Sequence, residues 1–460
     1  MFGSVGGTIR GHLHDARNCQ GLFFSERLSP ESVRLACEQL QYEFRERVFS
    51  PAVTLWVFLS QVLSADHSCR AAVAKLNFWR VARHLAPCSP DTGSYCEARQ
   101  HLPESLLEDL VRATGRELAG QTDHAWHWQG RVVKVIDGST ITMPDTPENQ
   151  SEYPQHSVQA EGVGFPIARI VVVFSLAVGA VVDTAIGPYQ GKQTGENNLF
   201  RRLRDALLAG EVALADRYYA SFWDFALLLE RAVDLVARSH QLRKIDFRKG
   251  LKQGCYDQVV AYAKPKQRSK WIDQATYDRL PGFILIRHLR YRVTQPGFRT
   301  RVITLATTLL DVDLYPAEEL ANLYRRRWDA ELHLRSLKTD MQMDHLRCKK
   351  PATVRKEFYT HLLAYNLVRD LMLQAALAAG VAPHQLSFKG ALQSLNVFLG
   401  TVIANSANAH RLYATLIWMI STHRVANRPD RMEPRLIKRR PKPYKLLQEP
   451  RHDARTRLLK

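Results

Sequence analysis

The sequence predicts an α/β protein whose mixed sheet carries helices and lies between a helical N-terminal region and a helical C-terminal region. Helix starts and stops recur between residues 26 and 120. β-branched segments follow, and then helices and strands alternate. A run of antiparallel strands followed by alternating helix and strand is typical of a mixed sheet with helices packed on it.

The composition is that of a globular chain with a polyanionic partner. With 460 residues, of which 45% are apolar and 24% charged, the chain can bury a large core and form two or three domains. Its 64 Lys and Arg against 45 Asp and Glu leave a net charge of +19. This balance favours nucleic acid over a membrane as the partner, although a basic protein without such a partner stays open.

Cysteine usage and hydropathy predict a soluble cytoplasmic protein with no membrane partner. The seven cysteines include no C-x-x-C pair, which argues against structural zinc and against a disulfide framework. The first residues, "MFGSVGGTIRGHLH", lack the apolar core of a signal peptide. The longest apolar runs, such as "IVVVFSLAVGAVV", are shorter than a membrane span.

The N-terminal region, residues 1–125, is predicted to be a helical domain. The segments "SPESVRLACEQLQYEFRER" and "SPAVTLWVFLSQVL" each begin with a Ser-Pro helix start. The segment "PESLLEDLVRATGRELAG" ends on a glycine, which is a common helix stop.

Residues 126–240 are predicted to form the first part of the α/β core. The run "RVVKVIDG" is a strand that ends at Asp137, and "EVALADR" is a strand that ends at Asp216. Between them, "PIARIVVVFSLAVG" and "AVVDTAIGPY" predict a hairpin around Gly179, and "TGENNLFRRLRDALLAG" predicts a helix capped by Thr194. Active sites of such sheets gather at the carboxyl ends of strands, where both aspartates lie.

A basic β-rich insertion is predicted at residues 241–310. Residues 238–301 contain 16 Lys and Arg against four acids. The segments "CYDQVVAY" and "FILIRHLRYRV" are rich in the β-branched and aromatic residues typical of strands. Residues 311–345 are predicted to carry a core helix, and residues 346–460 a helical region with a basic tail. The tail, residues 428–460, holds twelve Lys and Arg against four acids.

The segment "YRRRWDAELHLRSLK" presents a polar stripe on a predicted helix. At about 100° per residue, Tyr324, Arg327, Glu331 and Lys338 fall in one narrow stripe. Apolar side chains flank the stripe on both sides, and polar ones take the far, solvated face: Leu323, Leu334 and Leu337 on one side, Trp328 and Leu332 on the other, and Asp329, His333 and Asp340 on the far face. An i, i+4 ladder of surface ion pairs would explain the charges but not Tyr324 or the apolar flanks.

Three carboxylates, Asp137, Asp216 and Glu331, are candidate metal ligands. A cluster of carboxylates is costly unless cations neutralise it, and oxygen ligands are those that Mg²⁺ prefers. Two such ions about 3.5–4 Å apart support an in-line displacement at phosphorus. The alternative is that both aspartates are ordinary turn or cap residues. A tyrosine hydroxyl and two cations beside the carboxylates would suit the phosphates of a bound strand.

The stripe fits the spacing Y-x₂-R-x₃-E-x₆-K, and in this the chain resembles the DDE transposases of bacterial insertion sequences, in particular the insertion-sequence-4-type family. The segments "VIDGST" and "ALADRYY" resemble the family's two aspartate motifs. "SPAVTLWVFLSQVLSADHSCRAAV" and "SYCEARQHLP" resemble its N-terminal domain, and "RRPKPY" and "PRHDAR" its C-terminal tail. The resemblance covers nearly the whole chain.

This resemblance implies a ribonuclease-H-like core with a β-rich insertion between the second aspartate and the glutamate. Asp137, Asp216 and Glu331 would be the catalytic triad and bind two Mg²⁺ ions, for which Mn²⁺ can substitute. Tyr324, Arg327 and Lys338 would contact the DNA backbone.

The implied activity is cut-and-paste transposition, that is, metal-dependent hydrolysis and strand transfer at the terminal inverted repeats of an insertion sequence. The partners would be inverted-repeat and target DNA, held by a homodimer in the bacterial nucleoid. The N-terminal domain and the basic tail would bind the ends. Two alternatives are a nuclease of the same fold that does not join strands and a DNA-binding regulator without catalysis.

Trp271, in the basic stretch "KPKQRSKW", is a candidate for stacking on an unpaired or flipped base. Some members of the family resembled here use an aromatic residue of the insertion in this way. The alternative is a packing role in the insertion.

Overall fold

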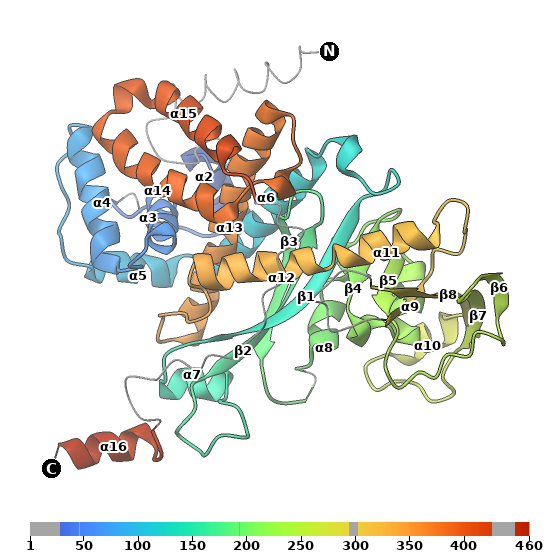
Figure 1. Ribbon diagram of the computed structural model, residues 1–460. Helices are drawn as coiled ribbons and strands as arrows, with labels where there is room; N and C mark the ends of the chain where they lie inside the picture. Colours follow the sequence, from blue (N-terminus) through green and yellow to red (C-terminus); the bar gives the residue numbers. More distant parts are fainter. Residues whose placement is uncertain (1–27, 46, 193, 294–301, 426–446, 460) are drawn as a thin grey trace.

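The computed structural model describes residues 28–45, 47–192, 194–293, 302–425 and 447–459. In this part of the chain a single sheet runs through the molecule in the order β3-β2-β1-β4-β5-β9-β8-β7-β6 (Figure 1). The strands are β1 (Val133–Thr142), β2 (Ile167–Ser175), β3 (Val181–Pro188), β4 (Val212–Ala215), β5 (Asp234–Arg238), β6 (Leu251–Gly254), β7 (Asp257–Ala263), β8 (Phe283–Arg292) and β9 (Val302–Thr307). Most of the predicted basic tail lies outside the described residues.

The first five strands form the predicted mixed sheet. Strands β1, β2 and β3 pair antiparallel, whereas β1 pairs parallel with β4, and β4 with β5. The predicted hairpin turns at Gly179, whose φ of +78° is a conformation that glycine adopts without strain. This order is consistent with a ribonuclease-H-like core, and the predicted fold class is confirmed.

The basic segment that follows is β-rich, as predicted, and it extends the same sheet. Strand β9 pairs antiparallel with β5, and β8, β7 and β6 continue outward from it. A buried ion pair between Arg287 and Asp257 joins β8 to β7. Arg287 also donates a 2.7 Å hydrogen bond to the carbonyl of Tyr315. The extension is therefore anchored to the segment that leads into the helix with the polar stripe.

Helices surround the core sheet (Figure 1). The N-terminal region is helical as predicted, with α2 (Pro30–Gln39), α3 (Pro51–Leu63), α4 (Cys69–Ala82), α5 (Gly93–His101) and α6 (Glu104–Gly120). The middle of the chain contributes α7 (Pro147–Glu152), α8 (Glu196–Arg201), α9 (Phe222–Leu229), α10 (Gln274–Arg279), α11 (Ala317–Arg325) and α12 (Trp328–Arg335). The C-terminal region contributes α13 (Pro351–Ala379), α14 (Phe388–Ala404), α15 (Ala409–Thr422) and α16 (Arg451–Leu458).

The two faces of the sheet bury separate cores. Side chains of β1 alternate between them: Val135 joins the larger core with α3, α6, α12 and α13, and Ile136 joins the smaller core with α8 and α9. The buried amide of Asn366 on α13 joins the larger core to the sheet, since it bonds both the N–H and the carbonyl of Val181 at 2.8 and 2.9 Å. Gly115 on α6 allows the close approach, because a Cβ there would lie 1.8 Å from the Val181 carbonyl oxygen.

Helix α13 is the centre of the larger core. By length and composition it could cross a membrane, but 78% of its most apolar stretch is buried inside the protein. That burial is typical of a core helix of a soluble protein.

The helix predicted to begin at Thr194 is shorter than expected. Its N-cap is Gly195, and only Glu196–Arg201 is α-helical before a short 3₁₀ turn at Arg204–Ala206. The sequence pattern overestimated the helix because Leu203 and Leu207 fit its periodicity but pack as part of an irregular segment on the smaller core.

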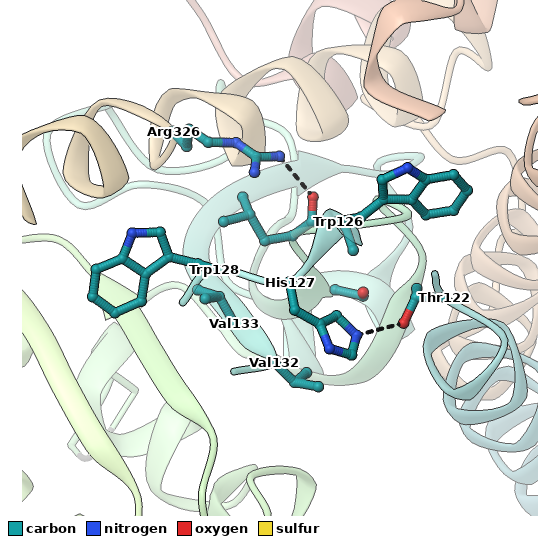
Figure 2. Close-up of a pocket in the computed structure, with 10 residues that line it drawn as sticks. Thr122, Trp126, His127, Trp128, Val132, Val133 and Arg326 are labelled. Carbon is teal, nitrogen blue, oxygen red and sulfur yellow. Dashed lines mark hydrogen bonds between the residues drawn. The ribbon is translucent and has the colours of Figure 1, made fainter. Parts of the chain in front are cut away.

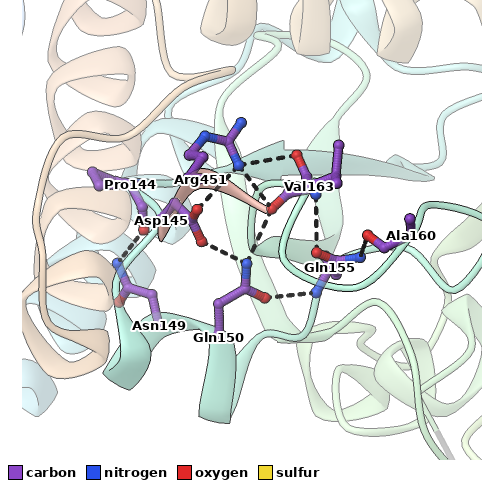
Figure 3. A network of polar contacts seen from close by, with 9 residues as sticks. Pro144, Asp145, Asn149, Gln150, Gln155, Ala160, Val163 and Arg451 are labelled. Carbon is purple, nitrogen blue, oxygen red and sulfur yellow. Dashed lines mark hydrogen bonds and ion pairs between the residues drawn. The ribbon is translucent and has the colours of Figure 1, made fainter. Parts of the chain in front are cut away.

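The C-terminal helix α16 returns to the loop that follows β1. One nitrogen of the Arg451 guanidinium lies 3.0 Å from the carboxylate of Asp145 and donates to the carbonyl of Val163 at 2.9 Å (Figure 3). The guanidinium also lies over the ring of Phe165. Asp145 therefore forms an ion pair with Arg451 of α16.

Two buried histidines meet where the N-terminal helices contact α13. The rings of His67 and His361 lie 5.5 Å apart. Burial lowers the pKa of His361 to about 3 and that of His67 to about 4, and the nearby Arg347 contributes to both shifts. Both rings are therefore neutral in the folded protein at mildly acidic pH, whereas an unfolded histidine takes up a proton near pH 6.5.

Acidification should consequently destabilise the fold from pH 6.5 down to about 4 for His67 and about 3 for His361, because the unfolded state binds more protons there. We expect His361→Gln to flatten the fall of the melting temperature across this window, and the exposed His101→Gln to leave the fall unchanged. Thermal unfolding followed by circular dichroism at several pH values measures both. An unaltered slope in His361→Gln would contradict the prediction.

Candidate active site

The first two predicted carboxylates lie side by side because of the parallel pairing of β1 with β4. In the register of this pair Val135 lies opposite Leu214, so Asp137 and Asp216 follow two residues later on each chain. Asp216 comes directly after β4, as predicted, but the prediction that the first strand ends at Asp137 is wrong: β1 continues to Thr142 because it keeps pairing with β2 beyond the end of β4. Val135 and Leu214 both face the larger core, and a strand alternates its side chains with a period of two. Asp137 therefore points to the face of the sheet on which α12 lies.

The third carboxylate, Glu331, lies on α12, which crosses β1 (Figure 1). The prediction of one regular helix from Tyr324 to Lys338 is wrong. Helix α11 ends at Arg325, a tight turn with i, i+3 hydrogen bonds follows, and α12 then passes into a π-helical turn at Ser336–Asp340. The π-turn widens the last part of the helix and places Lys338 beside β1.

The far face of this helix also differs from the prediction. His333 is buried, not solvated, and its Nδ1 lies 2.7 Å from the guanidinium of Arg369 on α13. Trp328 and Leu332 are exposed by 44% and 45%, so the apolar flank on that side has no cover among the described residues. Leu323, Leu334 and Leu337, on the other side of the stripe, are buried. The pattern of exposure differs from the prediction because α12 packs against α13 as well as against the sheet.

Two neighbouring arginines at the junction of α11 and α12, Arg326 and Arg327, point in different directions. Arg326 donates a 3.1 Å hydrogen bond to the carbonyl of Leu176 beside the β2–β3 turn, above a small cavity of about 10 Å³ (Figure 2). A cavity of this size holds at most one water molecule. Arg326 thus ties the junction to the sheet, while its neighbour Arg327 turns toward the carboxylates.

Arg327 bridges two of the three carboxylates. Its guanidinium donates to Oε1 of Glu331 at 2.7 Å and lies 3.9 Å from Oδ2 of Asp137. Burial raises the pKa of Asp137 to about 6; Arg327 opposes this rise, and Glu331 adds to it. Burial also raises the pKa of Tyr324, which lies near Arg327 and Asp216. The charge of Arg327 therefore acts on Asp137, Glu331 and Tyr324 together.

Lys338 and Tyr324, the remaining predicted DNA contacts, have different environments. The ammonium of Lys338 donates a 3.1 Å hydrogen bond to the hydroxyl of Ser139, two residues after Asp137 on β1. It therefore reaches the site despite the irregular helix. Tyr324 is only 6% exposed and packs in the larger core. Because so little of Tyr324 is exposed, only its hydroxyl at the floor of the site could contact DNA.

The oxygen atoms of the site suit a hard divalent cation. Oδ1 of Asp137 accepts the N–H of Gly138 at 3.0 Å, which orients the carboxylate, and Oδ2 faces Arg327. No three acidic, histidine or cysteine side chains of the described residues converge as a ready-made metal cluster. Arg327 occupies the space between Asp137 and Glu331, where it supplies the positive charge that these carboxylates need. Carboxylate oxygens of this kind are donors that suit a hard divalent cation.

Trp271 lies apart from this group of side chains. It is half-buried, packs against the smaller core, and has the guanidinium of Arg201 3.4 Å from its ring centroid. One side of the ring is thus already engaged within the protein. Its proposed stacking on a base stays a prediction.

Sequence comparisons identify the family. The profile of the transposase DDE domain matches residues 128–367, more than half of the chain, and spans all three carboxylates. The chain belongs to the DDE transposase family. It is also 28% identical to the transposase InsG of the insertion sequence element IS4 from Escherichia coli strain K12, over 91% of this chain and 92% of that protein.

Two further matches are more limited. The transposase of insertion sequence element IS421 from Escherichia coli is 38% identical over 68 residues, which is 15% of this chain and 18% of that protein. The cryo-EM structure of a piggyBac transposase synaptic complex with hairpin DNA covers 86% of this chain and 84% of its own, with 10% identity and a TM-score of 0.43.

The transposase is thus of the IS4 type, and its family membership implies DNA binding and dependence on a divalent metal ion. Sequence reasoning missed one acidic residue of this region. Glu196 at the start of α8 lies close to Gly138, and a first-turn glutamate of a short helix is ordinarily a cap for the helix dipole. Only the folded sheet shows where its carboxylate lies.

Removal of Arg327 should destabilise the transposase in the absence of metal. Arg327→Ala leaves Asp137 and Glu331 without their shared cation, so we expect the free energy of unfolding to fall by roughly 1–2 kcal/mol, given that Glu331 is partly exposed. Arg335→Ala, on the exposed face of the same helix, is the control. Urea unfolding in EDTA measures the difference. With excess Mg²⁺ the deficit should shrink, and an equal deficit in both buffers would contradict the prediction.

Proposed function

We propose that Asp137, Asp216 and Glu331 are the catalytic triad of this transposase and hold two Mg²⁺ ions, for which Mn²⁺ can substitute. Bound ions of this kind lower the pKa of a water molecule and neutralise the leaving oxygen in an in-line displacement at phosphorus. The observation that carries the proposal is the register of β1 with β4, which brings Asp137 within β1 beside Asp216 just after β4, with Arg327 linking Asp137 to Glu331 on α12.

The chain's own cations position the DNA in this proposal. Arg327 exchanges its carboxylate contacts for a phosphate of the bound strand, and Lys338 binds a neighbouring phosphate from its place beside Ser139. Tyr324 contributes its hydroxyl from the floor of the site. Holding the scissile phosphate in one orientation supplies a large part of the rate enhancement, because attack requires alignment of the reacting atoms.

The proposed reaction has two balanced steps at the terminal inverted repeats. Water first attacks a phosphodiester, which breaks its bond to the 3′ oxygen and leaves a 3′-hydroxyl and a 5′-phosphate. The 3′-hydroxyl then attacks another phosphodiester, on the opposite strand or on target DNA. In this second step one phosphorus–oxygen bond forms as another breaks, so no covalent link between protein and DNA is needed.

We propose that the helical N-terminal region, residues 1–125, and the basic tail bind the ends of the element, and that a homodimer of the protein in the bacterial nucleoid holds both ends. The core, residues 126–240 and 311–345, would carry the chemistry, and the basic extension at residues 241–310 would contact DNA near the site. The net charge of +19 and the excess of Lys and Arg in that extension support binding to a polyanion.

The decisive comparison uses DNA with the element's own ends and flanks, mixed with Mg²⁺ or Mn²⁺ and either wild type or Glu331→Gln. We expect wild type to cut and join strands and Glu331→Gln to bind the ends but lose at least about 10³-fold in rate, as expected when transition-state stabilisation by the metals is removed. Gel analysis of labelled strands measures both steps. The exposed Glu148→Gln is the matched control, since it also removes one carboxylate.

Each other outcome contradicts part of the proposal. Cleavage without joining by wild type would favour a nuclease. If both proteins bind and neither cuts, a regulatory DNA-binding role would replace catalysis. The mass of the protein–DNA complex in the same mixture tests the dimer, since one protein per pair of ends would exclude it.

The role proposed for Trp271 is tested separately. If the indole stacks on a displaced base, Trp271→Ala should slow end cleavage more than it weakens end binding, because the base is displaced only in the cleavage-competent complex. Trp271→Phe should restore part of the rate, since it retains an aromatic face. Electrophoretic mobility shift and single-turnover cleavage give the two quantities. Equal losses in both, or none, would leave Trp271 as a packing residue against Arg201.

A further inference from the structure

A fourth carboxylate approaches the proposed triad from the opposite face of the sheet. Glu196 begins α8, whose apolar side chains pack on the smaller core, whereas α12 belongs to the larger core. Glu196 is half-buried. Within the part of the chain that the structure describes, its carboxylate has neither a hydrogen bond nor an ion pair.

Gly138 is what lets this side chain reach the site. Asp137 points to the α12 face of β1, so the next residue points to the α8 face. A Cβ at position 138 would lie 2.7 Å from Cδ and 3.0 Å from Oε1 of Glu196. The carboxyl group of Glu196 therefore occupies the space that a side chain next to Asp137 would otherwise fill.

The charge of Glu196 interacts with the charges of the two aspartates. Burial has the largest effect in raising the pKa of Asp137, Glu331 adds to it, and the charge of Glu196 adds a smaller amount. Burial likewise raises the pKa of Glu196 itself, and Asp216 adds to that rise although Arg169 opposes it. Asp137 thus has Glu331 on its α12 side and Glu196 on its α8 side. Carboxylates that act on one another in a partly buried environment are stabilised when a cation lies among them.

A buried hydroxyl beside these carboxylates provides an independent observation. Tyr219, three residues after Asp216, is 1% exposed, and its hydroxyl has no hydrogen-bond partner among the described residues. The charges of Glu196, Asp137 and Asp216, in that order of size after burial, raise the pKa of this hydroxyl. A buried hydroxyl without a partner is costly, and a water molecule or ion-bound water between it and the carboxylates would satisfy it.

We propose that Glu196 is a fourth carboxylate ligand of the divalent-metal site, on the side of Asp137 and Asp216, and that Tyr219 donates to a water held there. This inference rests on the proposed triad. Glu196 then contributes to metal affinity itself and not only to the stability of α8. The alternative is that its charge caps the N-terminus of α8.

Glu148 is a matched control for that alternative. It is also the first-turn glutamate of a six-residue helix, α7, and it is exposed. Glu148→Gln and Glu196→Gln remove the same charge from the first turn of equally short helices. Loss of a helix-dipole contribution should therefore affect the two variants alike.

The experiment titrates Mn²⁺ into the full-length protein without DNA and follows the free ion by electron paramagnetic resonance. We expect Glu196→Gln to raise the concentration for half occupancy about tenfold or more, and Glu148→Gln to leave it unchanged. Gly138→Ala should act like Glu196→Gln, because the added methyl displaces the flexible glutamate without altering its charge. Circular dichroism and melting temperature confirm that each variant is folded.

Asp216→Asn separates failure of this inference from failure of the triad. If Asp216→Asn loses Mn²⁺ binding while Glu196→Gln and Gly138→Ala bind as wild type does, Glu196 is not a ligand and the triad stands. If Asp216→Asn binds as wild type does, the triad itself is overturned, and Glu196 with it. Equal weakening in Glu196→Gln and Glu148→Gln would assign the effect to the helix ends and would overturn the proposal.

Discussion

The parallel pairing of β1 with β4 is the constraint on which the site depends. It sets Val135 opposite Leu214, and from that register Asp137 within β1 lies at the same level as Asp216 just after β4. Two carboxylates at this spacing repel each other in a partly buried environment. Arg327 supplies positive charge to Asp137 within the chain, and in the proposed mechanism divalent ions supply the remaining positive charge.

Packing on both faces of the sheet holds this arrangement in place. Asn366 bonds the backbone of Val181 from α13, and Gly115 lets α6 approach the same strand closely. Arg326 ties the junction of α11 and α12 to the β2–β3 turn. Because these contacts fix α12 against β1, Arg327 meets Asp137 and Glu331 in one geometry. A rigid scaffold of this kind suits an enzyme that works by aligning phosphates.

The basic extension shows how the fold combines catalysis with binding. Strands β6 to β9 continue the core sheet, so the basic segment is attached to the core by continuous strand pairing among the described residues. The buried pair of Arg287 and Asp257 stabilises that attachment. DNA held along the extension would therefore have a defined position relative to the carboxylates.

The sequence by itself determined the family, the mixed sheet, the hairpin at Gly179, the β-rich extension and the spacing of the polar stripe. These features depend on local pattern, since strand and helix periodicity and a signature of fixed spacing can be read along the chain. Tertiary structure alone decided the break between α11 and α12, the π-turn that turns Lys338 toward Ser139, and the burial of His333. It also placed Glu196 above Gly138. Such features arise from contacts between residues far apart in sequence, where the packing of one element on another overrides local periodicity.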